Sequence, residues 1–175
     1  MWVRSEYAGE LAVLSAWLAP FVPWDVSLAS GVAGGDLLFV RFPFLEVTYA
    51  YGVPLESGVR VLDPLSALAL QRGTTAAVGY RAWVLAAAIL LLALALAVGY
   101  YLREERVEAA PIDPVRALGA LLAASGLSFG AAVYLLATNG LPALHVPIGA
   151  LLFVALGATL LAVERTEEPA ASDRI

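Results

Sequence analysis

His145 is the first candidate for acid–base or metal chemistry, because it is the only histidine in the 175-residue sequence. The chain has no cysteine, so disulfides and cysteine-ligated zinc or iron–sulfur sites are excluded. A lone histidine cannot form a haem pair or a histidine-rich metal site, and no serine or aspartate stands near it at a known active-site spacing. We therefore expect no catalytic residues, no cofactor and no metal. Two interpretations of His145 stay open: an ordinary residue in a short turn, or a proton or ligand site.

Ionisable residues within apolar stretches would mark an ion path or a proton relay. The long apolar stretches 82–102 and 117–163 contain none apart from His145. Glu10 and Arg81 lie near expected helix ends, where their side chains can extend to the membrane interface. The topology predicted below places these two residues at opposite membrane surfaces, so we do not expect them to pair. This absence argues against a proton- or sodium-coupled carrier, but not against a passive or lipid-handling role.

A ridge of small residues is the clearest local motif. Gly126 and Gly130 form a GxxxG pair, which Gly119 and Ala123 extend upstream on the same helix face. Small residues let helix backbones approach closely, so van der Waals contact can hold helices together in lipid. Two interpretations stay open. The ridge packs within the chain, against the last helix through Gly149, Ala150 and Gly157, or it joins two chains.

The overall composition is that of a membrane protein. Hydrophobic residues make up 61% and charged residues 14% of the chain, and the mean hydropathy is +0.83. Soluble domains are about half apolar and about a quarter charged. Disorder is excluded, because it requires low hydrophobicity and high charge. The net charge of −5 argues against a nucleic-acid partner, so the bilayer is the partner that the composition favours.

Three apolar stretches predict transmembrane helices. Residues 76–102 form one, since the uncharged run 82–102 is about 31 Å long as a helix and matches a hydrocarbon core of roughly 30 Å. The uncharged run 117–163 is too long for one crossing and contains glycine and proline residues near its middle. It predicts helices over 115–138 and 146–163, joined by a short outer turn at 139–145.

The first apolar segment predicts a fourth helix within residues 1–24, although its uncharged run is short. The alternative is a cleaved secretory signal, with Ser27-Leu28-Ala29 as a small-residue cleavage site. Aromatic residues near the expected helix ends predict an interface belt. Its members are Tyr7, Trp24, Tyr80, Trp83, Tyr100 and Tyr101.

Residues 25–75 are too long for a simple connection, so we expect structure of their own. The runs 37–52 and 59–62 predict short strands, with Pro43 splitting the first, and Asp63-Pro64 predicts the start of a short helix. Simple alternation assigns Leu37, Phe39, Leu45, Val47, Tyr49 and Tyr51 to one face, and Leu38, Val40, Phe42 and Phe44 to the other. Apolar residues on both faces favour either a lid packed on the helix ends or a docking surface for a partner or the lipid interface.

Arginines predict the orientation. The connection around residues 103–116 carries three, and the turn at 139–145 carries none. By the positive-inside rule, both termini and the linker 103–114 are cytoplasmic, and the segment 25–75 is extracellular. The polar, acidic tail 164–175 predicts disorder.

The opening MWVRSEYAGELAVLSAWLAPFVPW, with GVAGG and LLFVRFPF after it, resembles small uncharacterised haloarchaeal membrane proteins. The resemblance is best over about the first 60 residues. It implies several helices, an outer loop and a high-salt habitat, and it implies no site residues. All ten basic residues are arginine, and acidic residues exceed them, which suits the same habitat.

Together these observations predict an all-α membrane protein of four transmembrane helices, with a small β-rich extracellular loop between helices 1 and 2. The favoured function is a non-enzymatic accessory or scaffold subunit, whose outer segment docks a membrane-protein partner or a second copy. The alternative is a small transporter or channel component, in which Ser15, Ser125, Ser128, Tyr134 and Thr159 would line a common polar path.

Overall fold

A computed structural model describes residues 2–53, 58–103 and 113–166. Most of the predicted cytoplasmic linker and of the predicted disordered tail lies outside these described residues. The helices are α1 (Ser5–Leu18), the short 3-10 turn η1 (Ala19–Phe21), α2 (Pro64–Leu70), α3 (Ala77–Leu102), α5 (Pro114–Asn139) and α6 (Ile148–Leu161). The strands are β1 (Trp2–Arg4), β2 (Asp25–Val32), β3 (Gly35–Phe42), β4 (Leu45–Tyr51), β5 (Val59–Leu62), β6 (Leu144–Val146) and β7 (Glu164–Thr166).

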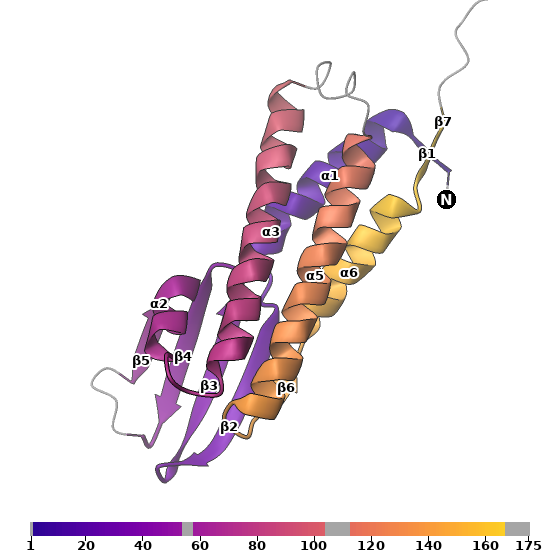
Figure 1. The fold of residues 1–175 in the computed structure, drawn as a ribbon. Coiled ribbons are helices and arrows are strands. Elements are labelled where there is room, and N and C mark those ends of the chain that lie inside the picture. Colours follow the sequence, from indigo (N-terminus) through magenta and orange to yellow (C-terminus); the bar gives the residue numbers. More distant parts are fainter. Residues whose placement is uncertain (1, 54–57, 104–112, 167–175) are drawn as a thin grey trace, which may run out of the picture.

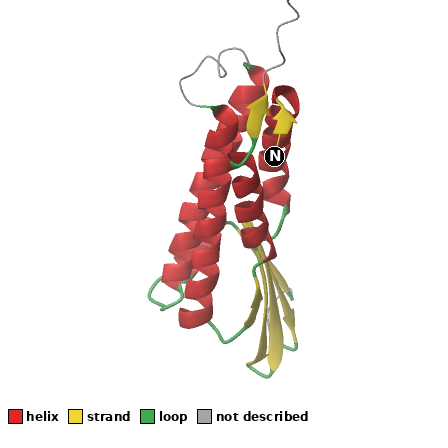
Figure 2. Ribbon diagram, turned by 90° about the vertical axis from the view of Figure 1, so that its right-hand side faces the viewer, coloured by secondary structure: helices red, strands yellow, loops and turns green. Residues whose placement is uncertain are grey.

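Two long helices, α3 and α5, run side by side along the whole molecule (Figure 1). Beside one half of this pair lie α1 and α6, and beside the other half lie the sheet and α2 (Figures 1 and 2). The chain passes from α1 through η1 into β2, and from β6 into α6. Because β2 and β6 pair with each other, the sheet is a continuation of the α1–α6 layer.

The sheet has five antiparallel strands in the order β5-β4-β3-β2-β6. A two-residue turn joins β2 to β3, and its residues Ala33 (φ 51°) and Gly34 (φ 86°) both adopt the positive φ that a type I′ hairpin requires. The strands β1 and β7 form a separate parallel pair at the far end of the bundle. Both described ends of the chain therefore lie away from the sheet (Figure 1).

The predicted all-α fold with four transmembrane helices is wrong. The segment 25–62 forms four strands, and β6 adds a fifth from within the predicted outer turn and its edge. Among the described residues, two helices, α3 and α5, are long and apolar enough to cross a membrane. The first and last apolar segments form helices of 14 residues each, about 21 Å long and short of a roughly 30 Å core.

The error has a physical cause in the strand pattern. A half-buried strand usually turns apolar residues inward and polar residues outward. In β2 the buried positions are Asp25, Ser27 and Ala29, while Val26 and Leu28 lie on the opposite, more exposed face. In β2, polar residues therefore point inward and apolar residues point outward, the reverse of the usual pattern. For this reason the sequence did not lead us to expect a strand before residue 37.

Capping residues begin α2 and α5 near the predicted positions. The Asp63 carboxylate accepts hydrogen bonds from the backbone N–H groups of Leu65 and Ser66, and Asp113 accepts one from Val115. Hydrogen bonds with the Ser66 side chain and with the backbone N–H groups of Ser66 and Leu65 lower the pKa of Asp63. The start of α3 has no side-chain cap. Instead, Thr75 just before it donates its hydroxyl to the Asn139 carbonyl at 2.6 Å and so ties the start of α3 to the end of α5.

The predicted ridge of small residues lies on α5, partly against α6. A β-carbon built on Gly119 would meet Leu160 and Gly157, and one on Gly126 would meet backbone atoms of α6. Ala123 lies in the same contact, against Gly157. Gly130, by contrast, has open space around it. Three of the four positions therefore belong to close packing within the chain.

Gly126 and Gly130 provide a matched pair of substitutions. In Gly126→Ala the new methyl group would lie 2.7 Å from the Val154 nitrogen, so we expect a loss of about 1–3 kcal/mol in the free energy of unfolding. Gly130→Ala adds a methyl group in open space and should stabilise the helix by up to about 1 kcal/mol. Thermal unfolding of both variants in one detergent measures the difference, and shifts of equal sign would contradict this packing.

Candidate functional site

Three charged side chains form a buried network on the inner face of the sheet. Asp25, Arg41 and Glu46 occupy directly paired positions on β2, β3 and β4. Arg41 donates from Nη1 to Asp25 at 2.6 Å and from Nε to Glu46 at 2.7 Å. All three residues are buried. Charge-assisted hydrogen bonds of this length are strong, and they hold three strands in one register.

The network keeps Arg41 charged despite its burial. Burial alone would lower the pKa of the guanidinium group, but the charges of Glu46 and Asp25 and the neighbouring Tyr80 raise the pKa above its ordinary value. The guanidinium carbon also lies 4.6 Å from the centre of the Phe39 ring, a cation–π contact. Removing Arg41 would therefore leave two carboxylates buried without their cation.

Side-chain hydrogen bonds join this network to the helices. The Tyr80 hydroxyl, on α3, donates to Glu46 at 3.0 Å. One turn along, Trp83 donates its indole N–H to the Pro43 carbonyl at 2.9 Å. Trp24, before β2, donates to the neighbouring Phe42 carbonyl at 3.1 Å. The turn between β3 and β4 is thus held by two indole groups.

Trp24 lies at the junction between the bundle and the sheet. Its ring stacks on Phe129 of α5, with ring centres 5.1 Å apart, and contacts Trp83 of α3 at 5.8 Å. Phe129 in turn contacts Phe153 of α6. One aromatic cluster therefore joins three helices at the level where the sheet begins.

His145 extends the network to the edge strand β6. Its Nδ1 lies 3.1 Å from one Asp25 oxygen and 3.3 Å from the other. Because a carboxylate can only accept, Nδ1 carries the hydrogen, and Nε2 is left facing away from Asp25. The sequence placed these residues 120 positions apart, and pairing of β2 with β6 brings them together.

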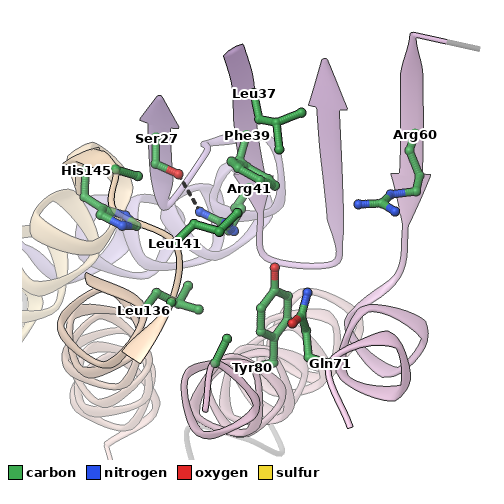
Figure 3. A pocket seen from close by; sticks show the side chains of 13 residues that line it. Ser27, Leu37, Phe39, Arg41, Arg60, Gln71, Tyr80, Leu136, Leu141 and His145 are labelled. Atoms are coloured by element: carbon green, nitrogen blue, oxygen red, sulfur yellow. Dashed lines mark hydrogen bonds between the residues drawn. The ribbon is translucent and has the colours of Figure 1, made fainter. Parts of the chain in front are cut away.

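The same inner face borders a cavity of about 250 Å³ between the sheet and the ends of α3 and α5 (Figure 3). Arg41 and Arg60 line it from the sheet, and His145 lines it from the edge. Tyr80 and Gln71 face it from the helical side. The cavity is thus lined by several hydrogen-bonding side chains from the sheet and from the helical side.

The outer face of the sheet has the opposite character. The paired positions form two complete rows across all five strands, and both rows consist of apolar or tyrosine side chains. Leu144, Val61 and Val146 are 71%, 60% and 43% exposed. We call this surface the outer face. Its rows are Leu144, Leu28, Leu38, Tyr49 and Val59, and Val146, Val26, Val40, Val47 and Val61.

The predicted aromatic belt divides into two groups. Trp24, Tyr80, Trp83 and Tyr100 are buried and pack against other side chains in the interior. Tyr7 and Tyr101 are exposed at the far end of the bundle. Tyr100 packs against Gly9 of α1, where a β-carbon would lie 2.6 Å from the tyrosine oxygen.

Sequence reasoning did not find the network. Arg41 and Glu46 were visible as single charges inside an apolar strand run, and that is a signal for inward-facing charges. Their common face was hidden by the turn at Pro43 and Phe44, which changes the alternation. The structure places Leu37 and Phe39 on the inner face, whereas Val47 and Tyr49 lie on the outer face with Leu38.

The fold and the site define an α+β protein with two helices of membrane length and an ion network beneath its sheet. The chain belongs to a family of unknown function, DUF7549, which matches residues 1–165. The expected membership of an uncharacterised family is therefore confirmed. No curated protein matches the chain.

Arg41 and Arg116 allow the buried network to be compared with a surface pair. We expect Arg41→Met to lower the free energy of unfolding by about 3–5 kcal/mol, because two buried carboxylates lose their cation. Arg116→Met removes a 3.9 Å contact with Asp113 from a side chain that is 62% exposed, so its effect should stay below about 1 kcal/mol. Denaturant unfolding in detergent measures both, and similar losses for the two variants would contradict the network's role.

Proposed function

We propose that this chain is an integral membrane protein of a haloarchaeon, and that it acts without catalysis as a subunit of a membrane assembly. Its α3 and α5 helices span the bilayer, and its sheet stands outside the bilayer and docks through the outer face. The occupant of the outer face is a second copy of the chain. The observation that carries this proposal is the pair of apolar rows across the whole sheet, six of whose ten positions are exposed in the described part of the chain.

Helix length and exposure support the membrane location. Each of α3 and α5 has 26 residues, or about 39 Å of helix, which exceeds a roughly 30 Å hydrocarbon core. Large apolar side chains face outward from the bundle, as contact with lipid would require. Examples are Leu85, Leu91, Leu92, Leu127 and Leu151.

The arginine distribution supports an extracellular sheet and cytoplasmic termini. The C-terminal end of α3 and the N-terminal end of α5 lie at the bundle end that also holds β1 and β7 (Figure 1). Arg103 and Arg116 flank the connection between α3 and α5, which the positive-inside rule assigns to the cytoplasm. At the other end, Arg41 is already paired with two carboxylates inside the sheet. Arginine in place of lysine and the acidic excess support the haloarchaeal source.

Continuity of the apolar surface supports a partner that is itself in the membrane. Leu144 and Val146 of β6 are exposed, and after Pro147 the first residues of α6 continue the exposure at Ile148 and Leu151. A partner that covers the outer face therefore meets the helices as well. Monomeric proteins rarely expose an apolar patch of this extent.

The absence of charge from both rows of the outer face supports a second copy as that partner. Five strands are about 24 Å wide at a spacing of about 4.8 Å. Two sheets pack face to face at about 10 Å when both inner surfaces are apolar. The ten row positions carry no charge, so they give a charged partner nothing to pair with, whereas an identical face complements them.

The transporter alternative has weaker support. The expected path residues do not share one environment: Ser125 donates to the Ala86 carbonyl of α3, and Thr159 donates within its own helix. Tyr134 is 68% exposed on α5. These contacts favour the docking function over transport.

Single cysteines test the orientation cleanly, because the chain has none of its own. Leu65→Cys places a thiol on α2, beside the sheet, and Arg116→Cys places one at the opposite end, both at exposed positions. In intact cells a membrane-impermeant maleimide should label the cysteine at residue 65 and spare that at residue 116 until the membrane is permeabilised. The reverse pattern, or recovery of the protein in the soluble fraction, would contradict the proposal.

Cross-linking tests the second copy. A bis-maleimide with a reach of about 10 Å, the spacing of packed sheets, should join two Val40→Cys chains, since Val40 lies on the central strand of the outer face. The product should have twice the chain mass of 18.3 kDa, both in native membranes and after purification. Leu65→Cys serves as the control, off the outer face, and should stay monomeric. A Val40→Cys chain that remains monomeric, or that joins a protein of another mass, would overturn the second copy as occupant.

A further inference from the structure

The cavity beneath the sheet has polar ends and apolar walls. One cross-strand row of the inner face runs from His145 through Ser27, Phe39 and Thr48 to Arg60. His145 and Arg60 therefore stand at opposite edges of the sheet, and both side chains point into the cavity (Figure 3). Leu37, Phe39 and Leu136 line the space between them.

Two nitrogen atoms in this cavity are buried and have no hydrogen-bond partner. They are Nε2 of His145 and Nε of Arg60. The His145 side chain is 8% exposed, and its other nitrogen is occupied by Asp25. Buried polar atoms are normally paired, so an unpaired one needs an explanation. Both atoms belong to side chains that line one cavity, and we take this as an indication of a molecule that supplies the missing partners when these side chains adjust to it.

The arginine side chains in the cavity wall favour an anionic ligand. Arg41 and Arg60 both line the cavity, whereas Asp25 and Glu46 lie behind Arg41 and are not among the lining residues. In the described part of the chain, Arg60 has no carboxylate within salt-bridge distance, in contrast to Arg41 with two. An arginine N–H group is a permanent donor and suits a carboxylate oxygen.

We propose that this cavity binds a small organic carboxylate. The carboxylate accepts from the Arg60 guanidinium, and the apolar body lies between Phe39 and Leu136. A polar atom at the far end, or a water molecule beside it, pairs with His145 Nε2. The volume of about 250 Å³ corresponds to about eight water molecules at roughly 30 Å³ each, so the ligand is of the size of benzoate or hexanoate. This site is on the opposite side of the sheet from the outer face and does not depend on the proposed docking.

Isothermal titration of the full-length protein in detergent tests this inference with benzoate and its neutral isostere benzamide. We expect benzoate to bind at least about tenfold more tightly than benzamide, because only the former pairs with Arg60 as an anion. Arg60→Gln should weaken benzoate binding at least about tenfold. Arg72→Gln, an exposed arginine beyond α2, is the matched control and should leave it unchanged.

Two further binding measurements test the location of the site and the source of the carboxylate. Ala143 lines the cavity, so Ala143→Phe should fill it and abolish benzoate binding while the melting temperature without ligand is retained. Oleate tests whether the carboxylate comes from a membrane fatty acid, whose chain would have to extend beyond the cavity. Tighter, Arg60-dependent binding of oleate assigns that source and overturns the limit to acids of the size of benzoate or hexanoate, and tighter binding of benzoate assigns a free acid. Equal binding of benzoate and benzamide, unchanged binding by folded Arg60→Gln protein, or preference for inorganic phosphate would overturn the inference.

Discussion

The burial of Arg41 between two carboxylates is the constraint on which the rest of the structure depends. Three charges can leave water only if they are paired and hydrogen-bonded, and the helices α3 and α5 provide the cover that keeps water away. Once Asp25, Arg41 and Glu46 face inward, the alternation of a β-strand turns their neighbours outward. The apolar outer face is therefore a direct consequence of the buried network.

The network contributes specificity to the fold more than stability. An apolar core of equal volume can be as stable as a buried ion pair, but it does not select one register. Here the Arg41 guanidinium bonds to groups on both neighbouring strands, and Tyr80 connects Glu46 to α3. Trp24 completes the junction by packing against Phe129. These contacts fix the position of the sheet along α3 and α5. The inner face of the sheet borders the cavity, and the outer face points away from the helices.

The sequence predicted the local elements better than their assembly. The start of α2 follows from Asp63-Pro64, because a cap acts over a few residues. The sheet could not be predicted in the same way. His145 reaches Asp25 only through the pairing of β2 with β6, which joins residues far apart in the chain. Trp83 shows a second reason why the sequence alone was insufficient. An indole N–H group can donate to lipid headgroups or to a protein carbonyl, and here it donates to the carbonyl of Pro43.

A double-mutant cycle on Tyr80 and Glu46 tests the central claim most directly, because it measures the bond between the ion network and α3. The free energies of unfolding of Tyr80→Phe, Glu46→Gln and the double variant give the coupling energy between the two side chains. Our account predicts a favourable coupling of about 1.5–3 kcal/mol, as for a buried hydrogen bond to a charged group. A coupling energy near zero would mean that the polar face of the sheet does not lie on α3, and it would contradict the account.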